Sequence, residues 1–209
     1  LEALRNQNPW ERTRKVPEVL SKSVRRPLAE ELWQTMLQNP YRFQMVLGPR
    51  RVGKTVALYQ TVQSLIEHGI PSDKLWFLRL DHPLLMHYEL GPWAKSLIAK
   101  FGGTDESPLY LFLDEVNYSN NWDKWLKTFF DERWPVRVIA TSSSTAALRN
   151  RTVESGVGRW SEQFLMPYSY SEFLSLQKAD ITMPQSHGDL FGTLNAAVEA
   201  KVNYAPQHS

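Results

Sequence analysis

Eight consecutive residues have the pattern of a loop that binds phosphate groups. Residues 48–55 read Gly-Pro-Arg-Arg-Val-Gly-Lys-Thr, which matches Gly-x-x-x-x-Gly-Lys-Ser/Thr. Glycines let a backbone come close to an anion, and successive amides then point at its oxygens. Lys54 adds a positive charge for the β- and γ-phosphates, and Thr55 adds a hydroxyl for Mg²⁺. We therefore expect every residue of the loop to contribute to binding: Gly48, Pro49, Arg50, Arg51, Val52, Gly53, Lys54 and Thr55.

The segments on either side of this loop fit the context that the pattern requires. Residues 42–47 read Arg-Phe-Gln-Met-Val-Leu, which is typical of a short buried strand, and apolar residues recur with a helical period from 55 to 68, before Gly69. A helix that starts near Lys54 would aim its N-terminal amides at the same anion. The alternative is a glycine turn before an ordinary amphipathic helix, which the preceding strand makes the weaker interpretation.

Two adjacent carboxylates follow a second apolar run. Residues 109–113 are apolar without alternation, as in a parallel strand covered on both faces, so Asp114 and Glu115 stand at its carboxyl end. Ligands bind at that end of open α/β sheets. Asp114 is placed to hold Mg²⁺, and the side chain of Glu115 points another way and could polarise the attacking water. The alternative is that both acids only favour the first turn of the helix that follows.

A third apolar run, residues 136–141, ends in small polar residues. Four residues could each present a hydroxyl to the γ-phosphate or to the attacking water: Thr141, Ser142, Ser143 and Ser144. Alternatively, these serines turn the chain and cap a short helix. The pattern predicts a polar strand end at the site and does not choose among the four hydroxyl residues.

Strands that alternate with helices predict an α/β fold with a mainly parallel sheet. We expect the three-layer fold of P-loop NTPases, with about five strands flanked by helices. The expected strands are 42–47, 74–81, 109–114, 136–141 and 162–168, and the expected helices are 27–38, 54–68, 91–103 and 121–134.

Composition limits the other functions that the chain could have. It has no cysteine, which excludes disulfides and cysteine metal sites and agrees with a cytoplasmic location. No apolar run approaches the length of a membrane span, and the first residues lack the apolar centre of a signal peptide.

Residues 1–27 are more basic than the rest of the chain. They contain seven Lys or Arg and three Glu, a net charge of +4 within a chain of net charge +2. A basic segment could contact nucleic acid. We favour a segment that packs along its own domain, and Trp10 with Pro9, Pro17 and Pro27 indicates an ordered, extended lead-in.

Together these pieces resemble the prokaryotic AAA-like ATPases of the "archaeal ATPase" type, whose members often carry a C-terminal domain of unknown function. The resemblance covers residues 1–176. We therefore divide the chain into a basic lead-in (1–27), a P-loop AAA-like ATPase domain (28–176) and an unassigned C-terminal segment (177–209). The matching segments are 8–10, 45–55, 78–85, 109–116, 121–132, 140–150, 154–160 and 167–174.

The resemblance implies roles for particular residues. Lys54 and Thr55 match the phosphate and metal positions, and Asp114 and Glu115 match the acidic pair. Ser142 or Ser143 falls at the sensor position, although the family usually has glycine at the place of Ser142. Arg159 matches a recurrent arginine that could act as a sensor or finger on the γ-phosphate; its alternative is a surface salt bridge.

The function predicted from these residues is Mg²⁺-dependent binding and hydrolysis of ATP, coupled to a conformational change that acts on a partner. The preference for ATP rests on the resemblance and on the absence of an Asn/Thr-Lys-x-Asp motif, which would read guanine, after the third strand. The partner would be a protein or a nucleic acid, and a homo-oligomer could supply an arginine from a neighbouring subunit. The alternative is a nucleotide-dependent switch with little hydrolysis. A small-molecule kinase is a third interpretation, but it needs an arginine-rich lid that the sequence does not show.

Overall fold

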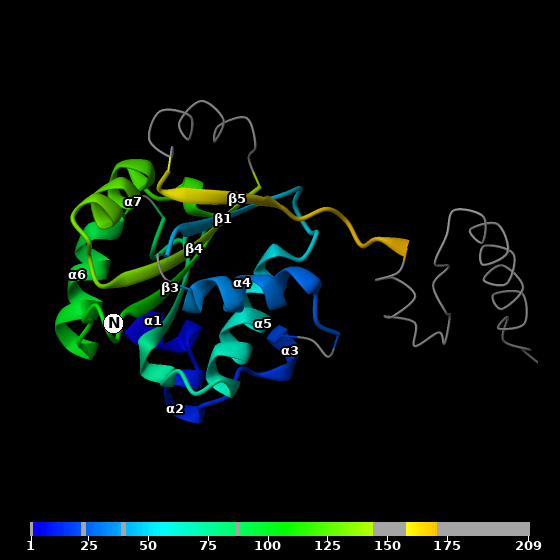
Figure 1. The fold of residues 1–209 in the computed structure, drawn as a ribbon, viewed down its shortest axis with the longest axis horizontal. Helices are drawn as coiled ribbons and strands as arrows, with labels where there is room; N and C mark the ends of the chain where they lie inside the picture. Colours follow the sequence, from blue (N-terminus) through cyan, green and yellow to red (C-terminus); the bar gives the residue numbers. More distant parts are fainter. Residues whose placement is uncertain (1, 22–23, 39–40, 87, 144–157, 171–209) are drawn as a thin grey trace, which may run out of the picture. The chain divides into compact units, whose positions relative to one another are not determined.

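The computed structural model of the chain describes residues 2–21, 24–38, 41–86, 88–143 and 158–170. The chain divides into two compact units, Leu1–Pro167 and Tyr168–Ser209, and only the first three residues of the second unit are described. The fold below is that of the first unit (Figure 1). The predicted boundaries at residues 27 and 176 stay predictions, and the segment 177–209 lies outside the described residues.

Five parallel strands form one sheet in the order β2-β3-β4-β1-β5. The α/β prediction with a parallel sheet is confirmed. The fifth strand begins and ends earlier than expected, because its backbone pairs with β1 from Trp160 onward. The strands are β1 (Phe43–Leu47), β2 (Leu75–Arg79), β3 (Leu109–Asp114), β4 (Val136–Ser142) and β5 (Trp160–Phe164).

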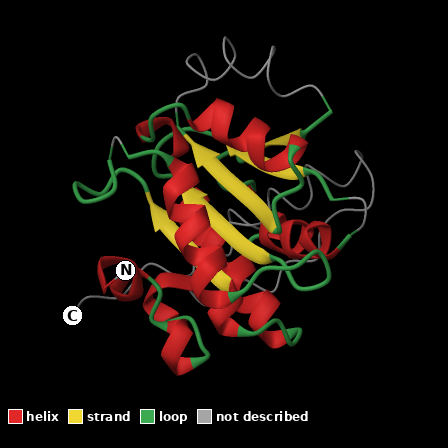
Figure 2. Cartoon of the chain, turned by 90° about the vertical axis from the view of Figure 1, so that its left-hand side faces the viewer, coloured by secondary structure: helices red, strands yellow, loops and turns green. Residues whose placement is uncertain are grey.

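Helices cover both faces of this sheet (Figures 1 and 2). Alternate residues of a strand point to opposite faces. In β2, Trp76 packs into the core under α6 and α7, and Phe77 packs into the core under α4 and α5. The four helices lie close to their predicted positions: α4 (Pro27–Leu37), α5 (Lys54–Glu67), α6 (Leu90–Phe101) and α7 (Trp122–Asp131). Among the described residues, no helix is long and apolar enough to cross a membrane.

The lead-in packs along its own domain, but it is helical rather than extended. It contains α1 (Glu2–Gln7), α2 (Trp10–Thr13) and α3 (Glu18–Ser21). Pro9 and Pro17 do not extend the chain, because each stands directly before a helix, where a missing N–H and a fixed φ are tolerated.

Three side chains of the lead-in satisfy the free edge of β2. The Asn8 amide donates to the Phe77 carbonyl (2.9 Å) and accepts from the Phe77 N–H (2.6 Å), as a neighbouring strand would. The Trp10 indole donates to the Leu75 carbonyl, and the Gln7 Oε1 accepts from the Arg79 N–H. Unpaired strand edges invite association with other chains. The Asn-Pro-Trp segment therefore closes one side of the sheet.

Replacing Asn8 by alanine should lower the free energy of unfolding by about 1–3 kcal/mol, because a buried N–H and a buried carbonyl of Phe77 lose their partner. Urea unfolding measures this loss. Gln7→Ala is the control, because Gln7 contacts the same edge at an exposed end. Equal stability of the two variants would contradict the assigned role of Asn8.

Candidate functional site

The loop between β1 and α5 has the backbone geometry that its glycines were expected to allow. Gly53 has φ +99°, in the left-handed region that glycine favours. A Cβ at Gly48 would lie 2.3 Å from the carbonyl oxygen of Leu165, so no side chain fits there. The Lys54 ammonium folds back over the loop and donates to the carbonyls of Gly48 and Pro49, each at 3.0 Å. The buried cation thus lies beside the backbone that would receive a phosphate.

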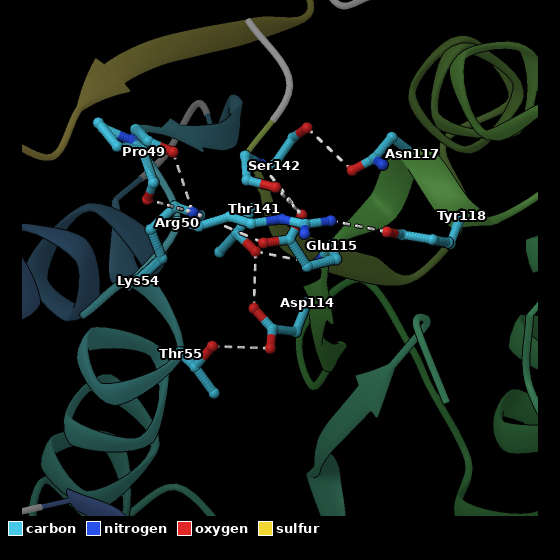
Figure 3. A network of polar contacts seen from close by, with 12 residues as sticks. Pro49, Arg50, Lys54, Thr55, Asp114, Glu115, Asn117, Tyr118, Thr141 and Ser142 are labelled. Carbon is cyan, nitrogen blue, oxygen red and sulfur yellow. Dashed lines mark hydrogen bonds and ion pairs between the residues drawn. The ribbon is translucent and has the colours of Figure 1, made fainter. Parts of the chain in front are cut away.

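Asp114 joins three elements of the fold at the carboxyl edge of the sheet (Figure 3). Its Oδ2 accepts from the hydroxyl of Thr55 on α5 (2.8 Å), and its Oδ1 accepts from the hydroxyl of Thr141 on β4 (2.7 Å). The side chain is buried. Burial raises the pKa of this carboxyl, the two hydroxyl contacts oppose that rise, and the nearby charges of Glu115 and Asp81 add to it.

Glu115 is held in an unusual backbone conformation. Its φ is +55°, which is uncommon for a residue with a side chain and is often found at functional sites. Its N–H donates to the Thr141 hydroxyl (3.0 Å). Its Oε2 accepts from both the N–H and the hydroxyl of Ser143, at 3.0 and 2.8 Å, and its Oε1 lies 3.5 Å from the Lys54 ammonium. The carboxylate therefore lies between the loop lysine and the end of β4.

Two of the candidate serines, Ser142 and Ser143, have different surroundings, and the third, Ser144, lies outside the described residues. Ser143 contacts Glu115 directly, whereas the buried Ser142 donates its hydroxyl to Asn117 Oδ1 at 2.9 Å. Ser143 is thus the serine that lies against the acidic pair. Its sensor role stays a prediction.

Arg159 lies at the opposite end of the sheet from the phosphate loop. Its carbonyl accepts from Phe43 at the start of β1, whereas the loop follows the end of that strand. The guanidinium makes two hydrogen bonds to Asp131, at 2.7 and 3.0 Å. Because β5 is parallel to β1 and begins at residue 160, the residue before it must lie at the amino edge. In this structure Arg159 is part of a surface ion pair.

A cavity of about 540 Å³ opens beside the loop. Arg50 and Tyr118 lie on its wall and contact each other, with the Arg50 guanidinium donating to the Tyr118 hydroxyl at 3.0 Å (Figure 3). The lining residues are Arg50, Arg51, Gly53, Lys54, Thr55, Val56, Asp81, Glu115 and Tyr118.

The sequence did not single out several residues that shape this site. The buried Arg26 braces the loop by donating to the carbonyls of Val52 and Met166 (3.0 and 3.1 Å). Thr141 was one of four candidate hydroxyl residues, and no local signal separated it from the three serines. No motif or spacing in the sequence indicated that Tyr118 would line the cavity.

Thr55 and Asp114 present the oxygen ligands that Mg²⁺ prefers. The Thr55 hydroxyl and an Asp114 carboxylate oxygen lie 2.8 Å apart. Magnesium sites for phosphate substrates use one or two protein oxygens, and phosphate and water complete the shell. In the part of the chain that the structure describes, no group of three or more His, Asp or Glu could hold a metal alone. The Thr55 and Asp114 oxygens therefore fit a Mg²⁺ ion whose remaining ligands come from a nucleotide and from water.

Comparison with known proteins agrees with the fold and the loop. A family model described as an AAA domain matches residues 41–174. The chain belongs to this AAA domain family. Membership of this family supports nucleotide binding at the phosphate loop described above.

The AAA domain is also similar to curated proteins whose functions are uncharacterised. It is 24% identical to a protein of Methanocaldococcus jannaschii over 68% of this chain and 30% of that protein. It is 25% identical to a protein of Haemophilus influenzae over 65% of this chain and 34% of that protein. The chain thus spans about a third of the length of these relatives. Among solved structures, Saccharomyces cerevisiae RIF2 aligns with a TM-score of 0.49 and 12% identity, covering 96% of this chain and 78% of that one.

Replacing Asp114 by asparagine should stabilise the nucleotide-free protein at neutral pH. Because burial raises the pKa of this carboxyl, the folded chain binds its proton more tightly than the unfolded chain, and stability falls as the pH rises through that range. The neutral amide avoids this cost. We expect a higher thermal midpoint for Asp114→Asn at neutral pH, and no difference below the ordinary aspartate pKa of about 3.9.

Asp131→Asn is the control for this experiment. A hydrogen bond from Arg159 lowers the pKa of Asp131, so ionisation of this carboxyl stabilises the folded chain instead of destabilising it. Asp131→Asn should therefore not stabilise the protein at neutral pH. A lower midpoint for Asp114→Asn than for the wild type at neutral pH would show that the buried charge carries no such cost.

Proposed function

We propose that the protein binds ATP with Mg²⁺ and hydrolyses it, and that this drives a conformational change acting on a partner. One observation supports the proposal most strongly. A single buried carboxylate, Asp114, contacts the hydroxyl of the loop residue Thr55 and the end of β4, with Glu115 beside it. Loop, metal oxygens and a candidate base thus stand within one hydrogen-bonded network.

Each residue has a task in this reaction. The amides of the loop and the Lys54 ammonium would bind the β- and γ-phosphates, with Lys54 exchanging its carbonyl contacts for phosphate oxygens. Thr55 and Asp114 would hold Mg²⁺, which neutralises charge that develops on the phosphate oxygens. Glu115 would orient a water and accept its proton, and Ser143 holds the Glu115 carboxylate in place.

Arg159 can contribute to hydrolysis only from a neighbouring copy of the chain, because in its own chain it lies at the far end of the sheet. Within one copy, Arg50 and Arg51 both line the cavity, and Arg50 is also hydrogen-bonded to Tyr118, which follows β3.

Lys54→Ala should weaken nucleotide binding. The loss of a charge-assisted contact costs about 1.5–3 kcal/mol, which is about tenfold to a hundredfold in affinity. Titration calorimetry with ATP measures the change. Lys74→Ala is a matched control, because the Lys74 ammonium also donates to two backbone carbonyls, those of Phe101 and Gly102, away from the loop. An unchanged ATP affinity in Lys54→Ala would contradict the assignment of this loop to the nucleotide-binding site.

Glu115→Gln should bind ATP as the wild type does and hydrolyse it about 10²- to 10⁴-fold more slowly, because the amide cannot accept a proton. A phosphate-release assay at saturating ATP measures the rate. Glu89→Gln changes a carboxylate that accepts from the Asn121 amide and does not line the cavity, and it should leave the rate unchanged. Equal rates for Glu115→Gln and the wild type would exclude Glu115 as the base.

A nucleotide-dependent switch is the second candidate, favoured by one specific contact. Both donors of Ser143 bind the same Glu115 oxygen, and Lys54 lies beside the other, so the carboxylate is engaged on both sides. A protein that keeps this arrangement with bound ATP would bind without hydrolysis. A single-turnover measurement separates the candidates: conversion of one bound ATP supports the hydrolase, and persistent ATP supports the switch.

A further inference from the structure

One hydroxyl contacts both acids of the site. Thr141 lies on β4, between β3 and β1, and is fully buried. Because Leu113 pairs with Ala140, Thr141 is the next residue along and lies opposite Asp114. Its Oγ1 is 2.7 Å from Asp114 Oδ1 and 3.0 Å from the backbone nitrogen of Glu115.

The direction of these two hydrogen bonds follows from their chemistry. A backbone N–H can only donate, so the Thr141 hydroxyl must accept from Glu115. A hydroxyl carries a single proton, and that proton is then directed to Asp114 Oδ1. The other oxygen of Asp114, Oδ2, is thereby turned toward the Thr55 hydroxyl. The Thr141 hydroxyl therefore fixes the rotation of the Asp114 carboxylate, with one oxygen toward β4 and the other toward the loop.

The same hydroxyl also supports the backbone of Glu115. A residue with a side chain reaches φ +55° at a cost, and such conformations persist only where surrounding contacts hold them. The N–H of Glu115 is bonded to Thr141 at this position, and the side chain then reaches Ser143. Without the Thr141 contact, the part-buried N–H of Glu115 and a buried carboxylate oxygen of Asp114 would both lose a partner.

We propose that Thr141 is the positioning residue of the site: its hydroxyl orients Asp114 toward the metal position and holds the backbone of Glu115, so that the two acids are placed together. This inference rests on the proposed function, because it assigns Asp114 to the metal and Glu115 to the water. Thr141 does not contact the nucleotide in this account and acts only through its two acidic neighbours.

The test compares Thr141→Val, which keeps the shape and removes the hydroxyl, with Thr141→Ser, which keeps the hydroxyl. ATP affinity is measured by calorimetry with Mg²⁺ and with a chelator. In the presence of Mg²⁺, Thr141→Val should bind ATP about 10- to 100-fold more weakly than the wild type, as is typical when a residue that orients a metal ligand is lost. In the chelator, the two proteins should bind ATP equally well. Thr141→Ser should keep the wild-type affinity in Mg²⁺. A full Mg²⁺ effect in Thr141→Val would overturn the proposal.

Thr61→Val is the matched control for the loss of a buried threonine hydroxyl. Thr61 is as buried as Thr141, but its hydroxyl donates to the Ala57 carbonyl within α5. This variant should keep the full Mg²⁺ effect. An equal loss in Thr61→Val would show a general effect of destabilisation and would overturn the assignment. If Thr141→Val does not fold, Thr141→Ala takes its place with the same expected results.

A second measurement needs no nucleotide, so it separates this inference from the proposed function. The Glu115 amide should exchange its hydrogen much faster in Thr141→Val than in the wild type, Thr141→Ser or Thr61→Val. If the wild type binds no ATP, the proposed function fails, and the exchange result still decides whether Thr141 holds Glu115. Equal protection in all four proteins would overturn the positioning role.

Discussion

A buried carboxylate is the constraint on which the site depends. Asp114 is almost inaccessible to solvent, and an ionised group in such a place is costly unless hydrogen bonds compensate for lost water. The compensation comes from Thr55 on α5 and Thr141 on β4, so the charge ties a helix and two strands together. A metal ion and a phosphate chain would use this negative charge directly. The free energy of unfolding that the protein loses by burying the Asp114 charge is therefore linked to its binding of metal and phosphate.

The order of strands explains why these groups meet. The sheet places β4 between β3 and β1, so the end of β4 lies between the acids and the phosphate loop. All strands are parallel, and their carboxyl ends share one edge. At the outer side of β2, Asn8 and Trp10 satisfy groups that a further strand would otherwise pair. The lead-in thus completes the sheet that carries the site.

Much of this arrangement could be predicted from the sequence, because the decisive signals are local. The spacing around Lys54 and the apolar run before Asp114 each specify a loop or strand end without knowledge of the rest of the fold. Contacts across strands left no such signal. The bond from Thr141 to Asp114 depends on strand register, and the place of Arg159 depends on where β5 begins. The lead-in was expected to be extended because of its prolines, but Pro9 and Pro17 stand before short helices and Pro27 begins α4.

The proposed mechanism requires metal and nucleotide to bind together between the loop and Asp114. Its most direct test is nuclear magnetic resonance of the labelled protein with ATP and Mn²⁺ in place of Mg²⁺, since the paramagnetic ion broadens signals from nearby amides. We expect the amides of Thr55, Asp114 and Glu115 to broaden most, and that of Gly69, beyond the far end of α5, to broaden much less. Sharp signals at Thr55 and Asp114 when ATP is saturating would contradict the account.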